Sequence, residues 1–114
     1  MKELVDKAEH LKQQEHYDEA FELFNLAAAQ GYADAQYHLG NCYYNGTGVQ
    51  QNYEKAVELY QLAAAQGNAQ AQYNLGVCYY NGIGISQNLK KAIELYKKAA
   101  DAGHEQAKER LKEL

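Results

Sequence analysis

The chain has 114 residues, enough for one domain with one core, and a net charge of −4. Apolar residues make up 46% of it, which is ordinary for a soluble globular protein. Acids and bases are interspersed without a basic stripe, so we expect no nucleic-acid partner. No apolar run approaches the ~20 residues that span a bilayer, so we expect no membrane partner.

The N-terminal stretch, MKELVDKAEHLKQQ, is charged and lacks the apolar segment of a signal peptide. This favours a soluble, cytoplasmic protein, although a signal removed before residue 1 would leave no trace. The chain has 11 Tyr against 2 Phe and no Trp. Such a composition favours half-buried rings whose hydroxyl ends meet water.

Residues 1–34 predict two helices joined by a short turn at Glu15 and His16. This N-terminal unit is four residues shorter than the units that follow, and it lacks their Gly-x-Gly. Its second half, AFELFNLAAAQGYAD, nevertheless matches AVELYQLAAAQGNAQ at 56–70. The unit therefore belongs to the same periodic pattern.

Residues 35–70 and 71–106 are two copies of one motif, identical at 22 of 36 positions. A period of this length indicates an array of stacked helical units. In the first helix of the first copy, one apolar face carries Ala35, Leu39, Cys42 and Tyr43. Gly46 suits a left-handed C-cap, and the glycine two residues later permits a second unusual dihedral angle.

The second helix of each copy follows Asn52 or Asn88, which are plausible N-caps. Its small alanines allow neighbouring helices to approach closely. The predicted buried stripe of the first copy consists of Tyr53, Ala56, Leu59, Tyr60 and Ala63.

Residues 107–114, AKERLKEL, begin a third copy and are charged, as suits a C-terminal capping helix. The pattern predicts an all-α, right-handed α-solenoid of antiparallel helix pairs, with about seven helices. We expect a single repeat domain, 1–114, divided into units 1–34, 35–70, 71–106 and 107–114.

The motif A-x-x-x-L-G-x-x-Y-x-x-G-x-G-[VI]-x-x-N-x-x-K-A-x-x-x-Y-x-x-A-A-x-x-G resembles the Sel-1-like repeat, a relative of the tetratricopeptide repeat (TPR). Asn52 and Asn88 depart from it, because an acidic residue is common there. The N-terminal unit resembles a plain TPR. The resemblance implies adaptors and scaffolds in signalling and protein quality control, with the first helix of each unit lining a concave binding surface.

Cys42 and Cys78 occupy the same position of the two copies. Equivalent positions in stacked units lie about 8–10 Å apart, whereas a disulfide needs Cα atoms within about 7 Å. We expect two free, buried thiols. His38, four residues before Cys42, has no counterpart near Cys78, so a reactive thiol pair is not repeated.

No cofactor, metal ion or catalytic set is expected. The Gly-x-Gly has no third glycine and follows a helix rather than a strand, so it predicts a connector and not a phosphate loop. No nucleophile, base and acid occur together, so we expect no enzyme. The four histidines are expected at the surface, without ligand spacing: His10, His16, His38 and His104.

Tyrosine and asparagine predominate on the expected concave face, where amides can bond a peptide backbone and phenol rings offer rigid contacts. For Tyr37, Tyr44 and their counterparts, ligand contact and packing between units stay equally open. Val5, Val77 and charged residues of the end helices are expected on the same face. The predicted peptide-binding residues are Tyr37, Asn41, Tyr44, Asn45, Tyr73, Asn74, Tyr80, Asn81 and Arg110.

Some TPR domains clamp a C-terminal carboxylate with lysine, asparagine and arginine. Asn41, Asn74 and Arg110 resemble part of that set, but Tyr37 and Gln106 stand where its lysines would be. This favours an extended peptide over a free C-terminus. We therefore expect a noncatalytic, monomeric scaffold or adaptor that binds protein or peptide. The alternative is an engineered or excised array without a native ligand.

Overall fold

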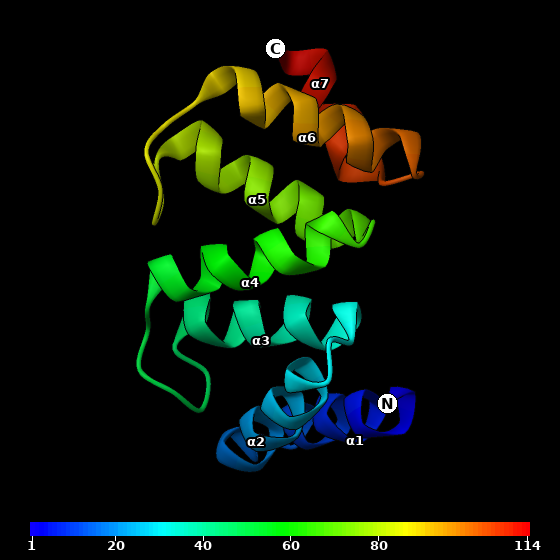
Figure 1. Ribbon diagram of the computed structural model, residues 1–114, viewed down its shortest axis with the longest axis vertical. Helices are drawn as coiled ribbons and strands as arrows, with labels where there is room; N and C mark the ends of the chain where they lie inside the picture. The colour runs from blue at the N-terminus through cyan, green and yellow to red at the C-terminus, as the bar shows by residue number, and fades with distance from the viewer.

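The computed structural model describes residues 1–114 as seven α-helices without a strand. Each helix packs chiefly against the helices before and after it, and Figure 1 shows the pairs stacked along the long axis. The predicted all-α solenoid is therefore confirmed. The helices are α1 (Lys2–Gln13), α2 (Tyr17–Ala29), α3 (Ala33–Asn45), α4 (Tyr53–Ala65), α5 (Ala69–Asn81), α6 (Leu89–Asp101) and α7 (Glu105–Glu113).

Helix ends follow from local sequence. The Asn52 and Asn88 side chains each accept a hydrogen bond of 3.1 Å from the backbone N–H three residues later, which confirms both predicted N-caps. Gly46 ends α3 in the left-handed conformation, with φ at 70°, as expected of a C-cap glycine. No helix is both long and apolar enough to cross a bilayer.

The Gly-x-Gly loops hold consecutive units together. Gly48 and Gly84 have φ of 73° and 70°. A Cβ on Gly84 would lie 2.6 Å from the backbone oxygen of Tyr53, and one on Gly48 would run into that of Tyr17. Each loop thus packs against the start of the preceding unit's second helix, where only glycine fits. The predicted connector is confirmed.

In the centre of the array, a glycine of each first helix lies against a tyrosine ring of the following helix. A Cβ on Gly40 would approach Tyr60 Cε1 to 2.7 Å, and one on Gly76 would approach Tyr96 Cε1 to 2.8 Å. Both rings are at most 2% exposed. These glycines let α3 and α5 approach α4 and α6 closely, which fixes the walls of the cavity described below.

Two expected positions are wrong. Val5, expected on the concave face, is 1% exposed, because it lies one turn before Ala8 on the face of α1 that packs into the core. Tyr53, expected in the buried stripe, is 39% exposed. It is the first residue of α4, at the margin of the core, and its ring lies 5.0 Å from that of Tyr44.

Cys42 and Cys78 are free and buried, as predicted. Burial raises the pKa of each thiol to about 11. The reactive thiolate form is therefore scarce at neutral pH.

Candidate functional site

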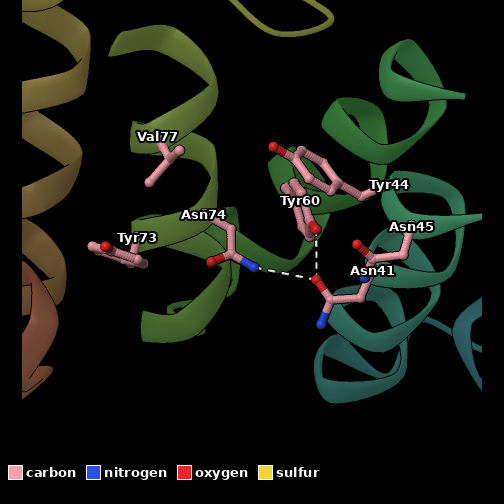
Figure 2. Close-up of a pocket in the computed structure, with 7 residues that line it drawn as sticks. All are labelled: Asn41, Tyr44, Asn45, Tyr60, Tyr73, Asn74 and Val77. Carbon is pink, nitrogen blue, oxygen red and sulfur yellow. Dashed lines mark hydrogen bonds between the residues drawn. The ribbon is translucent and has the colours of Figure 1, made fainter. Parts of the chain in front are cut away.

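A cavity of about 410 Å³ opens between α3 and α5, with a side chain of α4 at its back (Figure 2). The helix repeat brings positions 41, 44 and 45 of α3 to one face, and positions 73, 74 and 77 of α5 to the facing one. None of the lining side chains is charged. They are Asn41, Tyr44, Asn45, Tyr60, Tyr73, Asn74 and Val77.

A shared acceptor organises the centre of the cavity. Asn41 Oδ1 accepts hydrogen bonds from the Tyr60 hydroxyl at 2.5 Å and from Asn74 Nδ2 at 3.2 Å (Figure 2). The amide nitrogen of Asn41 and the amide oxygen of Asn74 have no such partner within the protein. Burial raises the pKa of Tyr60, so its hydroxyl stays protonated and continues to donate.

Aromatic rings form the sides. The Tyr44 ring lies 5.0 Å from that of Tyr53, and burial raises the pKa of Tyr44. The Tyr73 ring stacks on His104 with centroids 4.7 Å apart. Each of the two cavity tyrosines thus has an aromatic neighbour outside the cavity lining.

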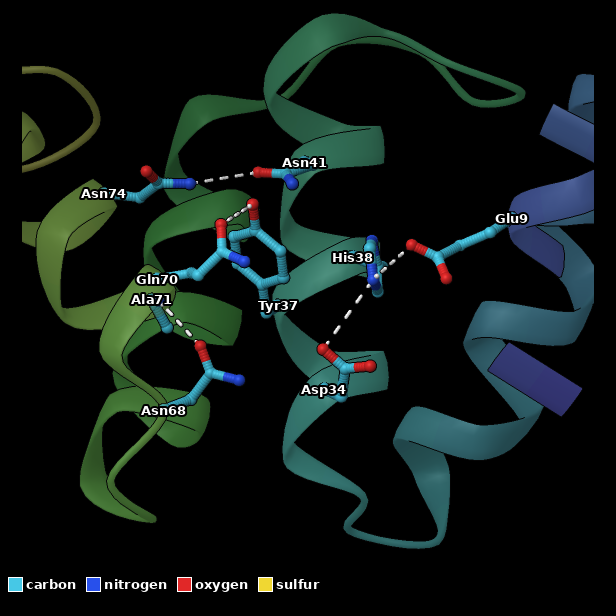
Figure 3. Close-up of polar contacts among 9 residues, drawn as sticks. All are labelled: Glu9, Asp34, Tyr37, His38, Asn41, Asn68, Gln70, Ala71 and Asn74. Atoms are coloured by element: carbon cyan, nitrogen blue, oxygen red, sulfur yellow. Dashed lines mark hydrogen bonds and ion pairs between the residues drawn. The ribbon is translucent and has the colours of Figure 1, made fainter. Parts of the chain in front are cut away.

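The cavity gathers five of the predicted peptide-binding residues and leaves out four. Tyr37 instead donates to Gln70 Oε1 at 2.9 Å, which ties one unit to the next (Figure 3). Asn81 donates to the backbone oxygen of Val77 in its own helix at 3.1 Å. Both side chains are thus engaged within the protein, and neither lines the cavity.

Tyr80 and Arg110 meet outside the cavity. The Arg110 guanidinium lies 5.2 Å from the centroid of the Tyr80 ring. Arg110 lines a second, smaller hollow, which it shares with Tyr73 and with acidic side chains of α7. Those acidic neighbours are Glu105, Glu109 and Glu113.

Sequence reasoning missed Tyr60 as a cavity residue because its ring belongs to the core. Its hydroxyl donates to Asn41 at the centre of the cavity. One signal was available: Phe24 stands at the equivalent position of the N-terminal unit, so packing there does not require a hydroxyl. An added hydroxyl at such a position points to a polar contact.

His38 does not lie free at the surface as expected. Its side chain is 14% exposed and its ring stacks on Phe24 at 4.9 Å. Nε2 lies 3.2 Å from Glu9 Oε1 and 3.7 Å from Asp34 Oδ1 (Figure 3). The ring fills the space between α1 and α3. Burial lowers the pKa of His38, and the two carboxylates oppose that shift.

His104 is also not an ordinary surface residue. Its Nδ1 accepts a hydrogen bond of 3.2 Å from the Ala107 backbone N–H, which caps α7. His10 and His16 are exposed, as predicted. Nowhere do three His, Cys, Asp or Glu side chains gather in a way that could hold a metal ion.

Three stretches of the chain match the model of the Sel1 repeat: residues 12–32, 33–68 and 69–104. Sel1 repeat proteins generally serve as scaffolds for protein interactions, and the fold is typically non-catalytic. No curated protein sequence matches the chain.

Solved structures with the same fold extend the comparison. A Sel1 repeat protein from Oxalobacter formigenes is 36% identical, with a TM-score of 0.88 over 94% of this chain and 43% of its own. A protective antigen of uropathogenic Escherichia coli strains, which displays an SLR fold, is 34% identical, with a TM-score of 0.81 over 83% of this chain and 20% of its own.

Cysteine-rich protein B of Helicobacter pylori is 28% identical, with a TM-score of 0.73. The match covers 77% of this chain and 66% of that protein. In each of these comparisons, the chain spans less than two thirds of the other protein's length.

Proposed function

The chain belongs to the Sel1 repeat family, and we propose that its cavity between α3 and α5 binds an uncharged, extended segment of a partner protein. The site binds the segment and catalyses no reaction on it. The observation that carries this proposal is the pair of asparagines that face each other across the cavity.

Asn41 offers a free amide nitrogen as donor and Asn74 offers a free amide oxygen as acceptor. Their mutual hydrogen bond uses the oxygen of Asn41 and one N–H of Asn74, so the Asn41 nitrogen and the Asn74 oxygen remain available. Each residue of a peptide backbone carries one N–H and one C=O, and in an extended segment both point to the same side. The pair is therefore complementary to the two backbone groups of a single residue, while the flanking rings of Tyr44 and Tyr73 supply contact area to its neighbours.

The charge distribution supports an uncharged segment. The cavity lining has no charged side chain, and Arg110, the one cation among the predicted peptide-binding residues, lies in a hollow with three glutamates. A carboxylate would have to leave water without gaining a cation, which is costly. This supports an internal segment over a free C-terminus.

The test uses peptides selected from a display library on the immobilised protein, with both ends blocked by acetyl and amide groups. Fluorescence anisotropy then compares the protein with an Asn74→Ala variant and an Asn81→Ala variant. Asn81 is the matched control, since it lies on the same helix and bonds only to it. Loss of the Asn74 contact should weaken binding about tenfold, which corresponds to ~1.4 kcal/mol.

Equal affinity of the Asn74→Ala variant and the unchanged protein would reject the proposed site. So would selected peptides that bind with a free carboxyl end but lose binding once that end is blocked as an amide. Circular dichroism of both variants checks that the helices are intact.

A further inference from the structure

The exposed side chains of α2, α4 and α6 form the outer face of the array, and their charge changes from one end to the other. The three helices follow one another along the long axis (Figure 1). Exposed charges are only acidic on α2 (Asp18, Glu19 and Glu22), mixed on α4 (Glu54, Lys55 and Glu58) and mainly basic on α6 (Lys90, Lys91, Glu94, Lys97, Lys98 and Asp101).

The change occurs at equivalent positions of the repeat. Asp18, Glu54 and Lys90 each follow the first residue of their helix, so one row runs from negative to positive. The four lysines of α6 take part in no ion pair, and neither do Asp18 and Glu22 of α2. Both ends of the outer face therefore carry charge that the molecule does not neutralise.

Two leucines lie along the same face. Leu26 of α2 is 51% exposed and Leu62 of α4 is 54% exposed, and they occupy one repeat position. The third member of that row is Lys98. Leu62 thus lies on the middle helix, between an acidic end and a basic end.

We propose that the outer face binds the outer face of a second copy of this chain. A two-fold axis parallel to α4 would place α2 of one copy over α6 of the other, and α4 over its own counterpart. The acidic α2 of each copy would then face the basic α6 of the other copy, and the two Leu62 side chains would lie near the axis. Each chain carries both an acidic end on α2 and a basic end on α6. A second copy therefore offers the opposite charge to each end, which is why we name a second copy and not another partner.

This contact is weak and sensitive to salt. Exposed ion pairs contribute little individually, and screening shortens their range from about 10 Å at 0.1 M salt to about 3 Å at 1 M. Glu22, Glu58 and Glu94 form a row of one sign, so their mutual repulsion opposes association. The proposal departs from the monomer expected from sequence, and it does not depend on the peptide site.

Two charge-reversal variants test the geometry by sedimentation velocity at about 20 mM salt. One carries Lys90→Glu and Lys97→Glu, and the other carries Asp18→Lys and Glu22→Lys. Each makes both ends of the outer face alike in sign, so each alone should sediment as a monomer. An equimolar mixture should dimerise again, because every end then meets its opposite.

The unchanged protein should dimerise with rising concentration at low salt and dissociate at about 1 M salt. A Lys2→Glu, Lys7→Glu variant is the control, because it changes net charge as much as the Lys90, Lys97 variant does but lies on α1. It should dimerise like the unchanged protein. A monomer under all conditions, assemblies larger than dimers, or a mixture of the two variants that stays monomeric would overturn the proposal.

Discussion

The second and third units share one packing contact but surround it differently. In the second unit the Tyr60 hydroxyl bonds to Asn41, which Asn74 also contacts. In the third unit, Tyr96 stands at the position of Tyr60, Val77 at that of Asn41 and Arg110 at that of Asn74. The Tyr96 hydroxyl and Arg110 Nε are buried without a well-formed hydrogen bond, and Arg110, which lies beside the hydroxyl, opposes the rise that burial causes in the pKa of Tyr96.

The difference separates what the scaffold needs from what the site needs. Both tyrosine rings lie against a helical glycine at nearly the same distance, so this contact defines the array. The third unit keeps the fold with valine, Val77, at the position equivalent to Asn41. The peptide cavity therefore depends on polar residues that one unit has and the next lacks.

The largest expected effect comes from the shared contact. Gly40→Ala or Gly76→Ala would push a methyl group into a buried ring, at a cost of about 1–3 kcal/mol in unfolding free energy. The higher helix propensity of alanine returns up to about 1 kcal/mol of it. Urea titration should show that the two variants lose unfolding free energy by similar amounts.

A double variant checks the cause. Tyr60→Leu makes room beside position 40, so its effect and that of Gly40→Ala should not add. Simple additivity would mean that the ring is not what excludes the methyl group.

The array itself was predictable because its determinants are local and repeated. Asn52 and Asn88 cap helices through their own next turn, and Gly46 needs only a backbone conformation. Val5 and Tyr53 were misplaced because burial depends on neighbouring units, which differ at the ends of the array and of each helix. Local periodicity does not contain that information.

The site was less predictable, since it depends on which hydrogen bonds form across helices. Tyr37 and Asn41 lie one turn apart on the same helix, yet one bonds to Gln70 and the other organises the cavity. The equivalence of the repeats placed these side chains on the same face. It could not assign their partners, which are about 19 to 33 residues away in the chain.

Removal of the two hydroxyl groups should sharpen the contrast between the units. Tyr60→Phe removes one of the two hydrogen bonds that the Asn41 oxygen accepts, so we expect a loss of about 1 kcal/mol in unfolding free energy. Tyr96→Phe removes a hydroxyl that makes no well-formed hydrogen bond and has Arg110 beside it, so we expect a smaller loss. Thermal or urea unfolding compares the two, and equal losses would contradict the difference described here.

A smaller effect is expected when the polar residue is restored. Val77→Asn gives the third unit the residue that its copy has at position 41, where Asn41 accepts from the tyrosine hydroxyl equivalent to that of Tyr96. We expect a gain of less than about 1 kcal/mol, since the amide must also leave water. Asn41→Val is the reciprocal change and should lower stability, and a loss in both variants would show that the two positions are not equivalent.

The smallest expected effect is a pH dependence that arises from the residue at position 38, where the later copies have Asn74 and Arg110. His38 faces Glu9 and Lys12 of α1 and Asp34 of α3, and burial holds its pKa below the usual value. The unfolded chain therefore binds a proton at residue 38 more readily than the folded chain does. The free energy of unfolding keeps its full value above about pH 6.5 and declines as pH falls below it.

His38→Asn removes the group and should flatten the decline in unfolding midpoint between about pH 7.5 and 5.5. Part of the decline should remain in this variant, because burial also lowers the pKa of His104. An unchanged slope in His38→Asn, with the slope lost in His104→Asn, would assign the dependence to the cap of α7 instead of the contact between α1 and α3.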